Sequence, residues 1–435
     1  MVAYPKTNKA WFSFIFAASF LLRVGLIVVT PQMNHQIDLN IYVDGGQLVS
    51  NNVNPYLFTE GVALRQQLRT DSTAFHSYTC ATQSRWDYYA SSNLPLSLIF
   101  YGAIDAVSTG NAFLYRLVFA FFDALLGLMV ILFLIKSFNK KTLNKLSATE
   151  KLMAIGFGAV SPTLLFWGVL MPEEKGVQIL LMLAALYTAR SRRWVLSAIC
   201  LGFSVTFKGL GVFVAPICWW YVIDRPTDFK SFISKNSLQM TALYVGLSVL
   251  VTALVFTPFL PDVLTMMTTR LDSNINSDKP NHAAIGRIFF ALAGDNWRIV
   301  KNLFVVFFIA IHLLLFRKRS FSPEVFTASS LLFFVDISLQ NGSLDRMNIG
   351  FMVAALLISQ SQLRYRFAMI GYSVVASSLL FLPAAWAKSK QTMDFEWFDC
   401  LFAFGFVVVY TTIILMNAIN VTNSFKNNSI KSLHP

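Results

Sequence analysis

The chain contains few charged residues for its size. Only 13% of its 435 residues are charged and 55% are hydrophobic, with a mean hydropathy of +0.57. Soluble domains carry about a quarter charged residues, so this scarcity argues against a soluble fold. Apolar runs such as 11–30, 112–135 and 401–418 come close to or exceed the roughly 20 residues that a helix needs to cross a bilayer. They recur along the chain, which predicts an all-α integral membrane protein with one polytopic domain, residues 1–435, and no large soluble part.

The sequence also lacks a concentrated basic surface and a metal-binding cysteine pattern. Its formal net charge is +13, yet Lys and Arg fall in short loops instead of an aromatic-interleaved patch, which argues against a nucleic-acid partner. Short basic loops are typical of the cytoplasmic ends of membrane helices. The cysteines show no CxxC or other metal spacing and are expected to be buried thiols; they are Cys80, Cys200, Cys218 and Cys400.

Charge along the first third of the chain predicts its orientation. Lys6 and Lys9 precede the first apolar run, which places the N-terminus inside. Residues 31–93 contain three Arg, no Lys and five acids, as expected of a segment outside. The basic segment 136–151 must be inside again, so a single helix at about 111–136 crosses between them.

The shorter apolar run 94–107 therefore cannot be a further crossing. It is too short for a comfortable span, and we expect an interfacial or re-entrant helix on the outer side. The first outer loop, with its interfacial helices, then covers residues 31–110. A second large outer loop is expected at 259–300.

Each crossing takes the chain to the opposite side of the membrane, and this alternation requires a break inside the long apolar run 194–223. Basic loops at 225–235 and 317–319 both need to be inside, and a turn near Lys208-Gly209 restores the alternation. We therefore predict about 12 transmembrane helices with both termini inside. Their ranges are 11–30, 111–136, 152–170, 176–190, 194–223 as two helices, 239–258, 301–316, 322–338, 347–361, 367–386 and 397–418.

Most acids lie in or beside the outer loops, so the outer face is the expected site of any chemistry. The first loop contains Asp38, Tyr42 and Asp44, then Asn54-Pro55-Tyr56 and Asn93-Leu94-Pro95-Leu96. An acid directly after a membrane helix can serve as a general base at the membrane surface. Asp and Asn also cap helices, and Asn-Pro-Tyr also forms ordinary turns, so the residues alone leave both interpretations open.

This order of motifs resembles the GT-C superfamily of membrane glycosyltransferases, which take sugars from polyprenyl-phosphate carriers. Asp38, Tyr42 and Asp44, followed by Asn54-Pro55-Tyr56, resemble the first outer loop of bacterial polyprenol-phosphate-mannose-dependent mannosyltransferases and of the first mannosyltransferase of GPI-anchor synthesis. Pro95-Leu96 matches the family's Tyr-x-Pro-Leu motif without its Tyr. Phe207-Lys208 with Ala215-Pro216 resembles the motif at the paired fifth and sixth helices.

The resemblance implies an inverting glycosyltransferase that moves a hexose, with mannose favoured, to a lipid-linked or cell-envelope glycan acceptor. Asp38 would be the general base, and Lys208, Arg270 and Arg23 would bind the donor phosphate. Some relatives carry Asp-x-Asp where this chain has Gln36 in place of the first acid, so we expect no metal, and no cofactor. Glucose, galactose and arabinose remain alternative sugars.

Further candidates would bind the acceptor or the sugar, and Glu173 and Glu174 are among them because they occupy a short outer turn. The candidates are Asp44, Tyr42, Glu173, Glu174, Asn281 and His282. Most of these residues also have simpler interpretations. Asp44 is equally suited to cap a helix, and Glu173-Glu174 to form a solvated turn. Lys208 is equally suited to extend to the lipid interface, Arg270 to form a surface salt bridge, and Arg23 to pair with Asp123. Arg116 and Asp123, seven residues apart, share a helix face and are expected to link helices.

Three other classes of membrane protein remain, and one of them is a purely structural membrane scaffold. A secondary transporter or a flippase of lipid-linked sugars would show inverted repeats with broken helices at the midplane, and the two halves show no such pair. An O-antigen-polymerase-like enzyme would rely on Arg-rich outer loops. For the favoured class we expect a multi-pass protein of the bacterial inner membrane, surrounded by membrane lipid, whose active site faces the periplasm or the exterior.

Overall fold

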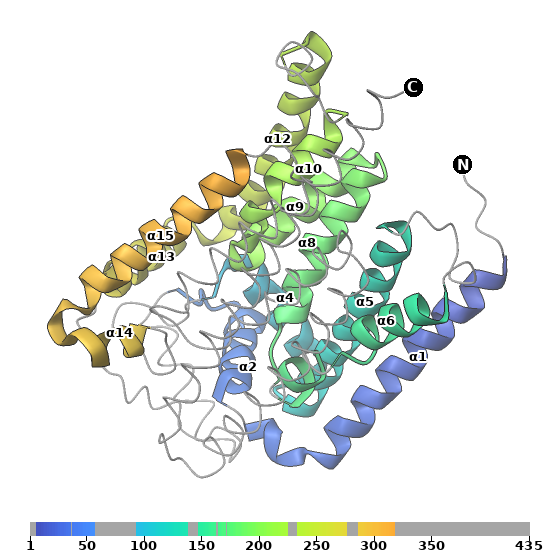
Figure 1. The fold of residues 1–435 in the computed structure, drawn as a ribbon. Coiled ribbons are helices and arrows are strands. Elements are labelled where there is room, and N and C mark those ends of the chain that lie inside the picture. Colours follow the sequence, from blue (N-terminus) through green and yellow to red (C-terminus); the bar gives the residue numbers. More distant parts are fainter. Residues whose placement is uncertain are drawn as a thin grey trace, which may run out of the picture. The chain divides into compact units, whose positions relative to one another are not determined.

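The computed structural model describes residues 6–35, 37–56, 93–137, 147–161, 164–170, 172–224, 233–275 and 286–317. Within these ranges every regular element is helical, and they contain no β-strand. This confirms the predicted all-α class for the described part of the chain. Figure 1 labels the helices.

Three described helices are long and apolar enough to cross a membrane. They are α1 (Lys6–Val29), α5 (Ala112–Ser137) and α12 (Lys235–Phe256), the last continued by the 3-10 turn η5 (Thr257–Phe259). The helices predicted at 11–30, 111–136 and 239–258 are confirmed. The side chain of Ser234 caps α12 by accepting a hydrogen bond from the backbone N–H of Ser237, which satisfies one of the unpaired donors at the helix start.

The predicted short helix of the first outer loop is present as α4 (Pro95–Ser108). Its N-terminal proline is favourable because the first turn has no partner for that N–H. It ends at Thr109, which adopts the left-handed conformation with φ 48°. The Asp105 carboxylate accepts a hydrogen bond from the backbone N–H of Gly110 at 2.8 Å and stabilises this end. Before it, η1 (Pro31–His35) and α2 (Ile37–Ser50) follow the first apolar helix.

The break expected near Lys208-Gly209 is confirmed. Helix α9 (Trp194–Lys208) ends at Gly209, whose φ of 78° suits glycine because it has no Cβ. The turn η4 (Leu210–Phe213) follows, and α10 (Ala215–Val222) begins with a proline in its first turn. Helix α8 (Lys175–Arg190) precedes α9, as predicted at 176–190.

One compact unit of the chain contains residues 1–129 and 168–277. Within it, α9 packs against both α8 and α12, and α4 packs against both α2 and α9 (Figure 1). Helix α1 contacts α5 through Phe16 and Phe20, which both pack edge-on against Phe121. Helix α13 (Asp262–Ile275) also belongs to this unit.

The second compact unit comprises residues 130–167 and 278–435. Its described helices are α6 (Ala148–Gly158), α14 (Gly286–Ala293) and α15 (Trp297–Arg317), with the 3-10 turn η6 (Gly294–Asn296) before α15. Helices α14 and α15 pack together, with Phe289 and Phe304 in ring contact at 5.2 Å. Helix α15 confirms the helix predicted at 301–316.

One sequence prediction needs correction. The continuous helix predicted at 152–170 is wrong, because α6 ends at Gly158 and a separate π-helical segment, η3, spans Leu165–Leu170. Pro162 stands between them in the sequence, and proline lacks the N–H that a continuous helix needs. The segment 259–300 contains α13 and α14, and its position as a second large outer loop stays a prediction.

The predicted helices at 322–338, 347–361, 367–386 and 397–418 lie outside the described residues. The total of 12 spans therefore stays a prediction. Of the cysteines, Cys218 is buried as a free thiol and Cys200 is half-buried and free, whereas Cys80 and Cys400 lie outside the described residues.

Candidate functional site

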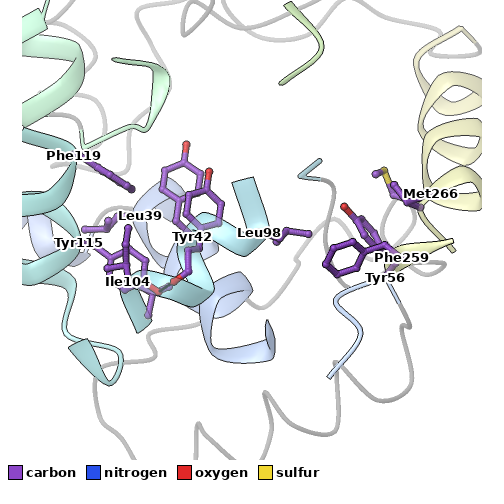
Figure 2. Packing of buried hydrophobic residues seen from close by; sticks show 12 residues of the cluster. Leu39, Tyr42, Tyr56, Leu98, Ile104, Tyr115, Phe119, Phe259 and Met266 are labelled. Carbon is purple, nitrogen blue, oxygen red and sulfur yellow. Dashed lines mark hydrogen bonds between the residues drawn. The ribbon is translucent and has the colours of Figure 1, made fainter. Parts of the chain in front are cut away.

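Helix α2 carries the first outer-loop motif into a buried cluster with α4. Figure 2 shows this apolar cluster, in which Leu39, Tyr42, Ile104, Tyr115 and Phe119 form one group. Leu98 lies between that group and a second one, made of Tyr56, Phe259 and Met266 (Figure 2). The motif residues Tyr42 and Tyr56 therefore both contribute to the packing of the outer segments.

Glycine allows α2 and α4 to approach closely. A Cβ at Gly46 would overlap the Tyr115 hydroxyl and the backbone of Tyr101. A Cβ at Gly102, on the facing helix, would overlap Val49. The close approach brings the Tyr42 and Tyr101 rings into a stacked contact, with centroids 5.0 Å apart and ring planes 28° apart.

The Glu174 carboxylate is the charged centre of the site. Glu174 immediately precedes α8, and it is completely buried. It forms an ion pair with the Lys208 ammonium at the end of α9. The hydroxyl groups of Tyr42 and Tyr101 lie near this carboxylate, although the Tyr101 hydroxyl and the two Glu174 oxygens complete no regular hydrogen bond. Side chains of α2, α4 and α9 thus converge on one acid.

The neighbouring cations decide the protonation of Glu174. Burial by itself would raise the pKa of this carboxyl group, because a charge is poorly solvated away from water. The ammonium groups of Lys208 and Lys175 outweigh that effect and lower the pKa of Glu174 below its ordinary value. Burial and the nearby Glu174 charge raise the pKa of Tyr101 well above its ordinary value, so this hydroxyl stays protonated. The cluster therefore combines a carboxylate, ammonium groups and neutral phenols.

Glu173, the acid that precedes Glu174 in the sequence, is also buried. Glu173 is 2% exposed and pairs with Lys175, the first residue of α8. The interpretation of Glu173-Glu174 as a solvated turn is therefore wrong. The acids are adjacent in sequence, which resembles a surface turn, but their cations Lys175 and Lys208 allow them to be buried.

A second polar contact joins α8 to α9 one helical turn further on. The Gln178 amide donates a hydrogen bond to the Ser204 hydroxyl at 3.0 Å, and both side chains are fully buried. Gln178 follows Glu174 by four residues and Ser204 precedes Lys208 by four, so the two contacts lie along the same helix–helix interface.

The two Pro-containing outer motifs meet in the fold. The Asn54 amide donates to the Asp262 carboxylate of α13 at 2.8 Å, and the Asn54 oxygen accepts from the backbone N–H of Tyr56 at 3.0 Å. The Tyr56 hydroxyl donates to the backbone carbonyl of Asn93 at 2.6 Å. Asn54-Pro55-Tyr56 thus forms a turn that ties the entrance of α4 to the start of α13.

The predicted catalytic residue Asp38 is the second residue of α2 and lies one helical turn before Tyr42. Asp44 lies in the middle of the same helix and is 3% exposed, with Tyr115 near enough for an electrostatic interaction. A capping role for Asp44 is therefore wrong, because caps stand at helix ends. Asp38 and Tyr42 share α2, and Tyr42 reaches Glu174.

The predicted phosphate-binding residues differ in their surroundings. The Lys208 side chain is 26% exposed while it pairs with Glu174. Arg23 is completely buried in α1, donates hydrogen bonds to Ser19 and interacts with Asp123, as the pairing interpretation predicts. Arg270 lies in α13. Asn281 and His282 lie outside the described residues.

Arg116 links helices, as its sequence position predicts. Its guanidinium donates to the carbonyl and hydroxyl oxygens of Thr30, each at 2.8 Å, to the Asn34 side chain at 2.8 Å and to the Val169 carbonyl at 3.2 Å. Asp123 is equally buried, with Gly168 and Gly176 packed directly against its carboxylate. Among the described residues, no group of three or more His, Cys, Asp or Glu side chains forms a metal-binding cluster.

Comparison with known proteins agrees with the motifs. Residues 20–224 match the model of the family described as alpha-(1->6)-mannopyranosyltransferase, N-terminal domain. The predicted family resemblance is confirmed. The match supports a glycosyltransferase that acts on mannose, and it covers Asp38, Tyr42, Glu174 and Lys208. A search of curated proteins gave no significant match. Together with the apolar helices, the match supports a membrane protein.

Sequence reasoning missed two buried polar residues on the helices around Glu174. Tyr101 stands inside the apolar run of α4, and Gln178 inside that of α8, without a motif around either. Both are completely or almost completely buried. A polar side chain within an apolar helix needs a buried partner, and that was the available signal.

Proposed function

We propose that this protein is an inverting mannosyltransferase. It moves mannose from a polyprenyl-phosphate carrier to a lipid-linked or cell-envelope glycan at the outer face of the membrane. Asp38 is the general base, and Lys208 and Arg270 bind the donor phosphate. The observation that carries the proposal is the family match, because it spans the motifs of the first outer loop and Lys208.

The arrangement around Glu174 supports this assignment of roles. Asp38 belongs to the same helix as Tyr42, and Tyr42 interacts with the carboxylate that also holds Lys208. A base and a phosphate-binding cation must lie on either side of the reacting carbon, and α2 and α9 supply one each. Lys208 is partly exposed, so its ammonium is accessible to an anion.

The reaction follows from these roles. The acceptor hydroxyl oxygen attacks the anomeric carbon of mannose, a C–O bond forms there, and its proton passes to Asp38. The bond between the anomeric carbon and the phosphate oxygen breaks, and the polyprenyl phosphate leaves with the electron pair. Its charge rises as the bond breaks, so Lys208 and Arg270 stabilise the transition state more than the ground state. Attack opposite the leaving group inverts the anomeric centre.

Sugar and acceptor recognition is proposed for Asn281 and His282. Tyr42, Asp44 and Glu173 are buried, so they support the site from within the protein and do not touch the sugar. Arg23 is completely buried near Asp123, which favours a structural role over phosphate binding. No metal is included in the mechanism, since cationic side chains can neutralise the leaving group.

The test is incubation of the purified protein in lipid nanodiscs with polyprenyl-phosphate sugars and a membrane glycan acceptor. Polyprenyl-phosphate mannose is expected to give transfer, whereas the glucose, galactose and arabinose analogues give little. A nucleotide-linked mannose donor serves as the control and is expected to be inert. Transfer from the nucleotide donor alone, or movement of an intact lipid-linked sugar across a vesicle without transfer, would contradict the proposal and favour another class.

A further inference from the structure

Glu174 has no exposed surface, so it is unsuited to touch a sugar directly. Its side chain is 0% exposed, whereas that of its partner Lys208 is 26% exposed. A buried carboxylate reaches a substrate only through the groups that surround it. The surrounding groups here are Lys208, Lys175 and the hydroxyls of Tyr42 and Tyr101.

These partners come from separate helices. Tyr42 belongs to α2, Tyr101 to α4, Lys208 ends α9, and Glu174 stands at the start of α8. The helix start favours a negative charge, because the unpaired N–H groups there carry partial positive charge. One carboxylate therefore fixes the relative position of helices that carry the proposed base and the proposed phosphate ligand.

The charge balance explains why the acid is needed. Two ammonium groups, those of Lys175 and Lys208, interact with the same carboxylate. Lys175 also pairs with Glu173, so removal of the Glu174 charge would leave Lys208 without its ion-pair partner in a poorly solvated environment, where charge interactions are strong. Breaking a buried ion pair by removing one partner leaves the other charge uncompensated. Lys208 would then be expected to leave its present position.

We propose that Glu174 is a positioning residue for glycosyl transfer, which holds the Lys208 ammonium and the Tyr42 hydroxyl so that cation and base keep their separation. This inference rests on the proposed function. It assigns Glu174 a different role from sugar binding. The observations that carry it are the Lys208–Glu174 ion pair and the complete burial of Glu174, with the Tyr42 hydroxyl near the same carboxylate.

The test compares Glu174→Gln with Gln178→Met in the mannose transfer assay. Glu174→Gln keeps the shape of the side chain and removes its charge. Gln178→Met is the matched control, because Gln178 is equally buried on α8 and joins the same helix α9 through Ser204. Loss of a supporting contact typically costs about 10- to 100-fold, so kcat of Glu174→Gln should fall by that amount. The control should keep kcat near the wild-type value, and Glu174→Asp should retain more activity than Glu174→Gln.

A double-mutant cycle separates positioning from general loss of structure. Tyr42→Phe removes the hydroxyl that interacts with Glu174, so its effect on kcat should be smaller in the Glu174→Gln background than in wild type. Thermal unfolding and size exclusion verify that each variant is folded. If Glu174→Gln does not accumulate as folded protein, Tyr42→Phe alone is assayed. Its kcat is expected to fall while KM for the donor and acceptor stays unchanged.

The outcomes are distinguishable. Normal kcat in Glu174→Gln, an equal loss in Gln178→Met, or independent effects of the Tyr42 and Glu174 changes would each overturn the positioning role while leaving the transferase intact. In the fallback arm, normal kcat in Tyr42→Phe, or a rise in KM without a fall in kcat, would do the same. Absence of transfer by the wild-type protein would overturn the proposed function itself, and the positioning role with it.

Discussion

Burial of charged side chains at individual positions is the feature that most separates this structure from its sequence pattern. Glu173-Glu174-Lys175 is three adjacent charged residues, which usually form a solvated turn. Both acids are nonetheless buried, because Glu173 pairs with Lys175 and Glu174 with Lys208. Lys208 was identifiable from sequence as a cation at an apolar helix end. Its partner was not, because it lies on the preceding helix.

The Glu174 ion pair predicts a dependence of stability on pH. Its folded pKa is lowered by Lys208 and Lys175 despite burial, so the carboxylate contributes stability above its unfolded pKa of about 4.3. That contribution is lost as the pH falls through the lower folded pKa. Glu174→Gln should therefore lower the unfolding temperature of the detergent-solubilised protein at pH 7, and the difference from wild type should shrink under strongly acidic conditions.

Differential scanning fluorimetry of both proteins across this pH range measures the effect. The other acids titrate in both proteins, so the difference in unfolding temperature between wild type and variant at each pH cancels their contribution. A difference in unfolding temperature that stays constant from neutral to strongly acidic pH would contradict the ionic role of Glu174.

At the scale of elements, the sequence predicted helix ends well where the alternation of basic loops and the position of a glycine both required a turn. The turn after Lys208 was required by the positions of basic loops, and Gly209 adopts the left-handed conformation there. The helix after Pro95 was likewise identified from its length. The failed prediction, at 152–170, treated an apolar run as one helix although Pro162 interrupts it.

Apart from the Arg23–Asp123 pairing of α1 with α5, the contacts between elements could not be predicted from sequence. Asn54-Pro55-Tyr56 reads as a local turn, and it is one, but Asn54 also bonds to Asp262 and Tyr56 to Asn93. These partners are distant in the chain, and no periodic pattern relates them. Nearby positions on one helix, such as Arg116 and Asp123, were predictable because the helical period places them on one face.

The close packing of α8 on Asp123 gives a prediction for Gly176. A Cβ at this position would overlap the Asp123 carboxylate, which is fully buried and cannot move freely. Overpacking of this kind typically costs about 1–3 kcal/mol, so Gly176→Ala should lower the unfolding temperature. Gly156→Ala in α6 is the matched control, because nothing lies within 4 Å of its Cβ position.

The control replacement should be neutral or stabilising, since alanine favours a helix over glycine by about 0.5–1 kcal/mol. Thermal unfolding of the two purified variants in the same detergent measures both effects. Equal stability of the Gly176 and Gly156 variants would show that α8 does not pack on Asp123 as described.

For the whole molecule, orientation in the membrane is the property that the charge pattern predicts most directly. Asn51 follows α2 in the predicted first outer loop and is exposed, whereas Arg192 lies in the turn between α8 and α9 with its side chain 80% exposed. A cysteine at Asn51 should react with a membrane-impermeant maleimide in intact cells. A cysteine at Arg192 should react only after the cells are permeabilised.

Labelling is measured relative to the parent protein, whose own cysteines supply the background. The reverse pattern would place the Asp38 segment on the cytoplasmic side and contradict the proposed outer active site. Equal labelling of both positions in intact cells would contradict the assigned crossings between them.

The central claim is that Asp38 is the base of mannose transfer from a lipid carrier. It is tested most directly by single-turnover transfer from polyprenyl-phosphate mannose with wild type and Asp38→Asn. The account predicts that the replacement lowers the rate by about 10²- to 10⁴-fold, the usual contribution of a general base, while the folded protein still binds the donor. Near-normal transfer by Asp38→Asn would contradict it.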